Sequence, residues 1–347
     1  MSPALTELGA RLVAYLSGRW RQPLTLKHIE QIPGGASRET YRVRLDTPTG
    51  ERGVIVRRDP PSSLIDTERA LEYRTYAAVH GSGIPVPEPL LLEEDPAPLE
   101  RPFSVMAEIE GCETAVAVLA EPGREAQRQP LGEEAWTLLG RLAALDIDAL
   151  GVTGFMAMPE HTAARELDYW AGVIEADALH PQPVAAAAVR WLRRHLPPPS
   201  PRHVLVHGDY RAGNLLFDGD GRIRGVLDWE MAHIGDPLED LAWSLDPLWG
   251  WPARERAGGL LPRAEAIRLW EAASGQRVDR ELFRWWQVFA SLKALAIWIS
   301  STEDFVRGQS KEPILALAGW VMTDRQNRIL VDRLRPGSPH RYTEPLA

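Results

Sequence analysis

The chain has 347 residues, of which 44% are hydrophobic and 25% are charged, so it has the composition of a soluble globular protein with one large or two modest domains. Its formal net charge of −9 disfavours nucleic-acid binding, because nucleic-acid-binding proteins usually carry a basic face. A single cysteine, Cys112, excludes an intramolecular disulfide framework. No run approaches the ~20 apolar residues of a membrane-spanning helix, and residues 1–20 lack the pattern of a secretory signal. We therefore expect a cytoplasmic protein without a membrane partner.

The first 110 residues alternate short apolar runs with turn signals. This pattern predicts β-strands over residues 26–32, 40–45, 53–57, 90–92 and 103–109. A helix is expected over 62–80, where apolar residues recur near the 3.6-residue period and Gly81-Ser82-Gly83 ends the run. The region therefore predicts a small antiparallel sheet with one helix.

Beyond Gly111 the composition changes, and 12 of the 13 tryptophans lie past residue 130. Two strands are predicted over 214–217 and 223–229, joined by Asp-Gly-Asp-Gly, a strong hairpin signal. Apolar periodicity predicts helices over 132–145, 163–176, 184–195, 237–243, 264–273, 280–300 and 314–333. The fold class is therefore α+β, with a mostly helical second part.

Arginine supplies nearly all the positive charge, because only three of the 39 basic residues are lysines: Lys27, Lys293 and Lys311. A Walker A loop requires Gly-Lys-Ser/Thr, and this chain has no such sequence, so P-loop nucleotide binding is excluded. If a cation in the middle of the chain holds phosphate, that cation is an arginine.

Three oxygen-bearing side chains follow or end apolar strands within residues 204–243. Asp209 comes directly after the strand Val204-Leu205-Val206 and His207-Gly208, and Asn214 lies five residues later. The predicted hairpin returns Asp228 to the same end as Asn214, so we expect the three side chains to converge. An aspartate in such a turn is, taken alone, more often a capping residue, but the joint spacing favours a functional group of residues.

This group suits phosphoryl transfer. Magnesium prefers a few hard oxygen ligands together with waters and substrate phosphates, and Asn214 and Asp228 can supply that pair. Asp209 is then placed to orient an attacking hydroxyl and to accept its proton, while Arg211 can reach charge that develops on the transferred group. His207 is expected to brace the loop by hydrogen bonds.

A helix start follows this group. Asp236, Pro237 and Glu239 fit the N-cap, N1 and N3 positions of a helix. Asp240 lies on the apolar face of that helix, and a buried carboxylate needs donors, so we expect it to bind backbone amides of the nearby loop.

The motifs HGDYRAGN, LDWE and GDPLEDLAW, in this order, resemble those of the aminoglycoside phosphotransferase family within the protein-kinase-like superfamily. In detail they are most similar to the kinase domain linked to large acyl-CoA dehydrogenases and to its free-standing bacterial relatives. The stretches IPGGASRETYRV, VIVRRDPPSS, LEYRTYAAV, GIPVPEPL and FSVMAEIEG also match in order. The resemblance implies a bilobal kinase-like fold. Residues 1–110 would be the nucleotide-binding lobe, with a hinge near 106–111, and residues 112–347 would be a helical lobe with the catalytic loop and substrate site.

The resemblance also implies a Mg²⁺-dependent transfer from ATP or GTP to a small-molecule hydroxyl, with Asp209 as catalytic base and Asn214 and Asp228 as magnesium ligands. Arg57 would stand where kinases place a phosphate-gripping lysine, with Glu72 as its partner and Glu68 as second choice. The remaining implied nucleotide contacts are Gly34, Gly35 and Ser37 in the loop over the phosphates, Met106 behind the adenine, and Ala107 and Ile109 at the hinge.

The acceptor stays open at this stage, among an aminoglycoside, a hydroxyacyl thioester such as a hydroxyacyl-CoA, a sugar or another small alcohol. A catalytically silent kinase-like module that binds nucleotide or a partner is the alternative, and a protein kinase is a weaker third option. Silent relatives usually lose a base or metal residue, whereas this chain keeps all three. The candidate substrate contacts are Tyr210, Glu230, His233, Trp285 and Lys293, with Trp243, Asp246, Trp249 and Trp286 as further positions.

Overall fold

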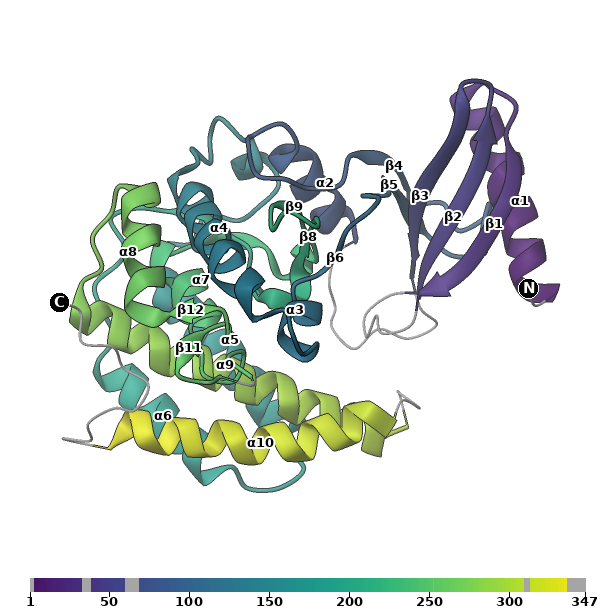
Figure 1. Ribbon diagram of the computed structural model, residues 1–347. Helices are drawn as coiled ribbons and strands as arrows, with labels where there is room; N and C mark the ends of the chain where they lie inside the picture. Colours follow the sequence, from purple (N-terminus) through teal and green to yellow (C-terminus); the bar gives the residue numbers. More distant parts are fainter. Residues whose placement is uncertain (1–2, 33–38, 60–68, 252, 309–312, 336–347) are drawn as a thin grey trace. The chain divides into compact units, whose positions relative to one another are not determined.

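The computed structural model describes residues 3–32, 39–59, 69–251, 253–308 and 313–335 (Figure 1). The chain divides into two compact units, Met1–Gly111 and Cys112–Ala347. The first contains an antiparallel sheet and the second is mostly helical. The α+β class predicted from the sequence is therefore confirmed.

The N-terminal unit is built on a five-stranded antiparallel sheet with strand order β1-β2-β3-β5-β4. On β2 every second residue is buried (Tyr41, Val43 and Leu45), which is the alternation of a sheet with one face on a core. The strands are β1 Thr25–Ile32, β2 Glu39–Thr47, β3 Gly50–Arg58, β4 Pro89–Glu93 and β5 Phe103–Ala107.

In the described part of this unit, two helices accompany the sheet rather than the single one predicted: α1 Pro3–Trp20 and α2 Arg69–Val79. Helix α1 lies along β1 and buries Leu12 and Leu16 in the same core as the sheet (Figure 1). The signal for α1 is present in the sequence, because Leu5, Leu8, Leu12 and Leu16 recur at helical spacing. The predicted start of the second helix at residue 62 lies outside the described residues.

The C-terminal unit is an assembly of helices with three short sheets. Helix α9 packs along α10, and α4 packs on α8 (Figure 1). All seven predicted helices form. The helices are α3 Val116–Ala120, α4 Glu125–Ala144, α5 Thr162–Asp177, α6 Pro183–Arg194, α7 Pro237–Ser244, α8 Arg263–Ser274, α9 Arg280–Val306 and α10 Pro313–Leu334, with 3₁₀ turns at Val152–Gly154, Ala212–Asn214 and Trp229–Met231.

The short strands position the polar loop. Strand β7 pairs with β10, and the predicted hairpin forms as β8 and β9, with β6 alongside. The strands are β6 Glu113–Thr114, β7 Val204–Val206, β8 Leu215–Phe217, β9 Ile223–Val226, β10 His233–Gly235, β11 Arg256–Ala257 and β12 Leu261–Pro262. All three residues of β7 are buried, so the loop that follows starts from a fixed point in the core.

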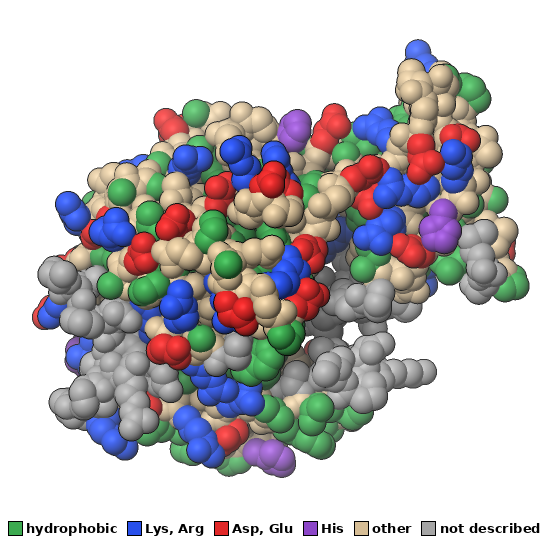
Figure 2. All heavy atoms as spheres, viewed as in Figure 1, with side chains coloured by type: hydrophobic (Ala, Val, Ile, Leu, Met, Phe, Trp, Pro, Cys, Tyr) green, Lys and Arg blue, Asp and Glu red, His purple; other side chains and the backbone are tan. Residues whose placement is uncertain are grey.

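Among the described helices, none is both long enough and apolar enough to cross a bilayer. On the face drawn in Figure 2, acidic and basic side chains are interspersed. This pattern is typical of a solvated surface.

Candidate active site

The loop after β7 is held in place through hydrogen bonds of its backbone N–H groups. The N–H groups of His207 and Gly208 donate to the two carboxylate oxygens of Asp240, at 2.6 and 2.9 Å. This confirms that the buried Asp240 binds loop amides. Gly208 has φ +85°, and a Cβ there would lie 2.5 Å from the carbonyl oxygen of Met231, so only glycine fits.

His207 braces this loop against the hairpin. Its Nδ1 accepts the N–H of Asp209 at 3.1 Å, and its Nε2 lies 2.9 Å from the carbonyl oxygen of Leu227. Nδ1 thus acts as an acceptor, and Nε2 can donate to the Leu227 carbonyl oxygen. Because both ring nitrogens are engaged and the side chain is fully buried, His207 has the bracing role that the sequence predicts.

Asp209 stands at the centre of a group of donors. Asn214 Nδ2 donates to its Oδ2 at 2.8 Å, and Trp243 Nε1 donates to its Oδ1 at 3.0 Å. Arg211 Nε lies 3.0 Å from each carboxylate oxygen. The Asp209 side chain is 14% exposed. The carboxylate is thus fixed in direction while part of it faces solvent.

The hairpin brings Asn214 and Asp228 to the same end of the ribbon. Leu215 pairs with Val226, and the N–H of Leu227 donates to the carbonyl oxygen of Asn214 at 2.8 Å. Asp228 follows directly with φ +69°, a left-handed conformation that aspartate tolerates better than most residues. Strain of this kind concentrates at functional sites. The predicted convergence of Asp209 with Asn214 is present as a hydrogen bond, and Asp228 lies next to the pairing partner of Asn214.

Among Asp209, Asn214, Trp243 and Arg211, the arginine is the most exposed. Its guanidinium lies 5.2 Å from the ring centroid of Trp249, and its side chain is 31% exposed. Stacking on an aromatic ring supports a guanidinium without blocking its N–H groups. The arginine can therefore keep its stack while its donors exchange Asp209 for another anion.

In the N-terminal unit, Arg57 and Glu72 form an ion pair at 2.6 Å, as predicted, with side chains 15% and 5% exposed. Met106 is buried on β5. The N–H of Ala107 donates to the carbonyl oxygen of Glu88 at 2.8 Å. The backbone hinge contact that the resemblance implies for Ala107 stays a prediction. Ile109 follows the end of β5. The positions Gly34, Gly35, Ser37 and Glu68 lie outside the described residues.

Comparisons with known proteins decide the family. The phosphotransferase enzyme family (APH) matches residues 28–289. The chain belongs to this family. Acyl-CoA dehydrogenase family member 11 of Gallus gallus is 31% identical over 240 residues, which cover 68% of this chain and 30% of that protein. The chain therefore spans less than a third of that relative's length.

Solved structures have the same fold as this phosphotransferase. One, from Ralstonia eutropha and assigned to the aminoglycoside phosphotransferases, superposes with a TM-score of 0.74 at 22% identity, over 94% of this chain and 97% of the other. Another, aminoglycoside phosphotransferase APH(4)-Ia in ternary complex with ADP and hygromycin B, gives 0.59 at 17% identity, over 91% and 98%. They confirm the fold that the motifs imply. Family membership places the chain among the phosphotransferases.

Three of the candidate substrate contacts are core residues of the phosphotransferase instead. Tyr210 is 2% exposed and donates to the carbonyl oxygen of Ala135 at 2.8 Å. Trp285 donates its Nε1 to the carbonyl oxygen of Leu192 at 3.0 Å and stacks on Phe289. Lys293 is also fully buried. The predicted role of these three residues as substrate contacts is therefore corrected. A sequence motif does not show which side of a loop or helix faces the interior. Glu230, two residues after Asp228, is partly buried.

His233 belongs to a buried charged cluster, here the His233 cluster, made of Glu166, His233, Glu239 and Lys293. Its Nε2 lies 3.1 Å from Glu239 Oε2 and 3.6 Å from Glu166 Oε1, and Nδ1 lies 2.9 Å from the carbonyl oxygen of Met231. Although burial by itself lowers the pKa of His233, the two carboxylates raise that pKa to about 9. The possible ligand atoms of Glu166, His233 and Glu239 lie within 4.8 Å of one another, a spacing that suits a metal ion. Here the imidazolium and the Lys293 ammonium already balance the two negative charges.

The His233 cluster predicts a pH dependence of stability. The pKa of His233 is raised in the folded state. Its proton therefore stabilises the fold fully at pH values below the ordinary histidine pKa of 6.5, and this contribution is lost as the pH rises through about 9. We expect the free energy of unfolding to fall by about 3 kcal/mol across this window from this group alone. His233→Gln should flatten that part of the curve, measured by urea unfolding from pH 6 to 9.5. The same change at the exposed His80 should leave the slope as in the wild type, and an unchanged slope in His233→Gln would refute the assignment.

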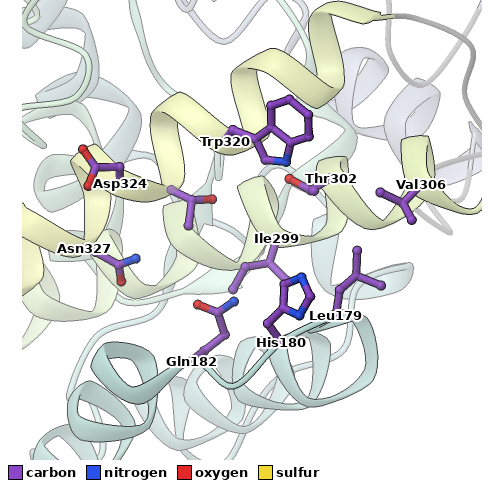
Figure 3. Close-up of a pocket in the computed structure, with 10 residues that line it drawn as sticks. Leu179, His180, Gln182, Ile299, Thr302, Val306, Trp320, Asp324 and Asn327 are labelled. Carbon is purple, nitrogen blue, oxygen red and sulfur yellow. The ribbon is translucent and has the colours of Figure 1, made fainter.

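A surface groove lies apart from the loop of Asp209. It has a volume of about 720 Å³ and runs between α9, α10 and the connection from α5 to α6 (Figure 3). None of its described lining residues belongs to residues 207–214. They are Leu179, His180, Gln182, Ile299, Thr302, Val306, Trp320, Thr323, Asp324 and Asn327.

Proposed function

We propose that the chain is a small-molecule kinase that transfers the γ-phosphoryl group of ATP or GTP to a hydroxyl of a small substrate, with Mg²⁺. The observation that carries the proposal is the fixed carboxylate of Asp209, which Asn214, Trp243 and Arg211 surround at hydrogen-bond distance. The ADP bound in the related APH(4)-Ia structure supports a nucleotide as the phosphoryl donor.

Asn214 and Asp228 fit a magnesium ion by the chemistry of their donors. The amide nitrogen of Asn214 is used by the backbone and side chain of Asp209, at 2.9 and 2.8 Å, which leaves its amide oxygen to face a cation. Asp228 adds a carboxylate next to the hairpin closure. Bound there, magnesium would supply positive charge against the nucleotide phosphates. Both ligands are hard oxygen donors, as that ion requires.

Asp209 acts on the acceptor in this proposal. Its carboxylate orients the acceptor hydroxyl and takes its proton as the hydroxyl oxygen bonds to the γ-phosphorus, while the bond from that phosphorus to the β–γ bridging oxygen breaks and the nucleoside diphosphate leaves. Trp243 and Asn214 keep the carboxylate aimed, and this positioning lowers the entropic barrier. Arg211 donates to the transferred group when it releases Asp209.

Arg57 is the proposed phosphate-binding cation of the N-terminal unit. Glu72 fixes its guanidinium through the 2.6 Å contact, as a helix glutamate does for the strand lysine in kinases. Arginine offers a planar fork where the usual residue offers a point charge.

Arg57→Lys tests this role. The change keeps the charge but loses the fork, so we expect the KM for magnesium–ATP to rise about tenfold, with kcat within about threefold of wild type. Steady-state ADP release measures both constants. Arg52→Lys, at an exposed position on the same strand, is the matched control and should leave both unchanged. Unaltered kinetics in Arg57→Lys would contradict the assignment.

An acceptor screen tests the proposed function as a whole. Purified protein is incubated with magnesium and ATP or GTP, and with aminoglycosides, hydroxyacyl-CoAs, sugars or amino alcohols, and products are read by mass spectrometry. The proposal predicts one product class heavier by a phosphoryl group, absent from Asp209→Asn. Nucleotide binding with no ADP formed under any condition would instead favour the silent module.

A further inference from the structure

We infer that Lys293 is a positioning residue that fixes the catalytic loop from helix α9, an inference that rests on the proposed function. Lys293 is 1% exposed, and its Nζ donates to the carbonyl oxygen of Gly208 at 2.8 Å. That carbonyl belongs to the peptide bond joining Gly208 to Asp209. The lysine therefore acts on the backbone immediately before the proposed base.

Gly208 is held from two helices at once. Its N–H donates to Asp240 on α7 at 2.9 Å, and its carbonyl accepts from Lys293 on α9. Its φ of +85° and its close approach to Met231 leave the residue little room to adjust. Because both polar groups of one residue are bound by charged side chains, the direction in which the chain enters Asp209 is fixed.

Lys293 also acts on the side chain of Asp209, through the ring of Trp243. Its ammonium lies 5.0 Å from the ring centroid of Trp243, and the indole N–H of that ring donates to Asp209 Oδ1 at 3.0 Å. A cation over the ring face restrains the ring that aims the carboxylate. Lys293 thus restrains both the backbone that precedes Asp209 and, through Trp243, its side chain.

Charge balance in the His233 cluster explains a cation at this position, but it does not require the hydrogen bond to Gly208. The ammonium is 3.5 Å from Glu239 Oε1 and 5.6 Å from the ring centroid of Trp170. Buried ion pairs are often matched or exceeded in stability by apolar residues of similar volume. The chain also uses arginine for all but three of its basic residues, yet it keeps a compact ammonium here. This ammonium is the group that donates to the Gly208 carbonyl oxygen.

Lys293→Met tests the inference, because methionine keeps the length and removes the donor. The probe is magnesium–ATP with water as acceptor, and ADP release is followed. Misplacement of a reacting group by about 1 Å can cost about 100-fold, so we expect kcat to fall at least tenfold while the KM for magnesium–ATP stays within about threefold. Ile299→Ala, a core truncation on the same helix, is the control for lost stability and should keep the wild-type kcat.

Three further variants keep the test decisive. Lys293→Met leaves the Glu239 carboxylate without its ammonium, so Lys293→Met combined with Glu239→Gln is made to preserve folding. Glu239→Gln alone retains the Lys293 contact to Gly208 and should lose much less kcat than the double variant. Lys293→Arg restores a charged donor and should recover part of the kcat lost in Lys293→Met.

Hydrogen exchange supplies a readout that does not need turnover. Exchange of the peptide covering residues 207–214 should rise in Lys293→Met and stay at the wild-type level in Ile299→Ala. Unchanged exchange together with unchanged kcat would overturn the inference. A wild-type protein that neither binds nor hydrolyses ATP would overturn the proposed function, and the exchange comparison would still decide whether Lys293 holds the loop.

Discussion

Asp209→Asn should lower the rate of phosphoryl transfer by about 10³-fold, because a general base contributes roughly 10² to 10⁴ and an amide cannot accept the proton. The asparagine has the same size and can still accept from Trp243, so the loop should stay in place. Nucleotide affinity should change less than about threefold, since the metal ligands remain. Product formation with the acceptor from the screen, or ADP release with water, measures the rate, and calorimetry measures the affinity.

The matched control is Asp218→Asn, in the turn of the same hairpin. Asp218 accepts from the N–H groups of Asp220 and Arg222 at 3.0 Å each. Among the described interactions it contacts none of Asp209, Arg211, Asn214 and Trp243. Its replacement should cost some stability and leave kcat within about twofold of wild type. Wild-type turnover in Asp209→Asn would exclude Asp209 as the base.

Asp228→Asn should weaken magnesium-dependent nucleotide binding by at least about 100-fold, because it removes the charged one of two proposed protein ligands. Asparagine is chosen because it tolerates the left-handed conformation at φ +69°, whereas alanine would add backbone strain. Titration of ATP with magnesium present and with magnesium chelated isolates the metal-dependent part.

The two variants should differ in kind. Asp209→Asn should keep the magnesium dependence of nucleotide binding and lose transfer, whereas Asp228→Asn should lose both. Asp220→Asn, at the exposed hairpin turn, serves as control for charge removal in this ribbon. An undiminished effect of magnesium on ATP affinity in Asp228→Asn would remove that residue from the proposed ligand set.

The hairpin of the site could be predicted because its signals are local. Asp-Gly-Asp-Gly between two apolar runs fixes the turn, and a turn of that length brings Asn214 next to the residue before Asp228. The capping pattern likewise predicts that α7 starts after Asp236, whose side chain accepts the N–H of Leu238.

Contacts between distant parts of the chain could not be predicted in this way. Trp243 lies 34 residues from Asp209 and Lys293 lies 85 residues from Gly208, so no spacing rule relates them. The sequence also does not show which side of an element faces the core. For this reason the motif predicts Tyr210 as a substrate contact, whereas its side chain lies in the interior.

A crystal structure with magnesium and a non-hydrolysable ATP analogue tests the central claim most directly. We predict one magnesium ion bonded to the amide oxygen of Asn214 and a carboxylate oxygen of Asp228 at about 2.1 Å, with Asp209 not bonded to it and facing the terminal phosphate. An ion held by other residues, such as those of the His233 cluster, or bonded to Asp209 itself, would contradict the account.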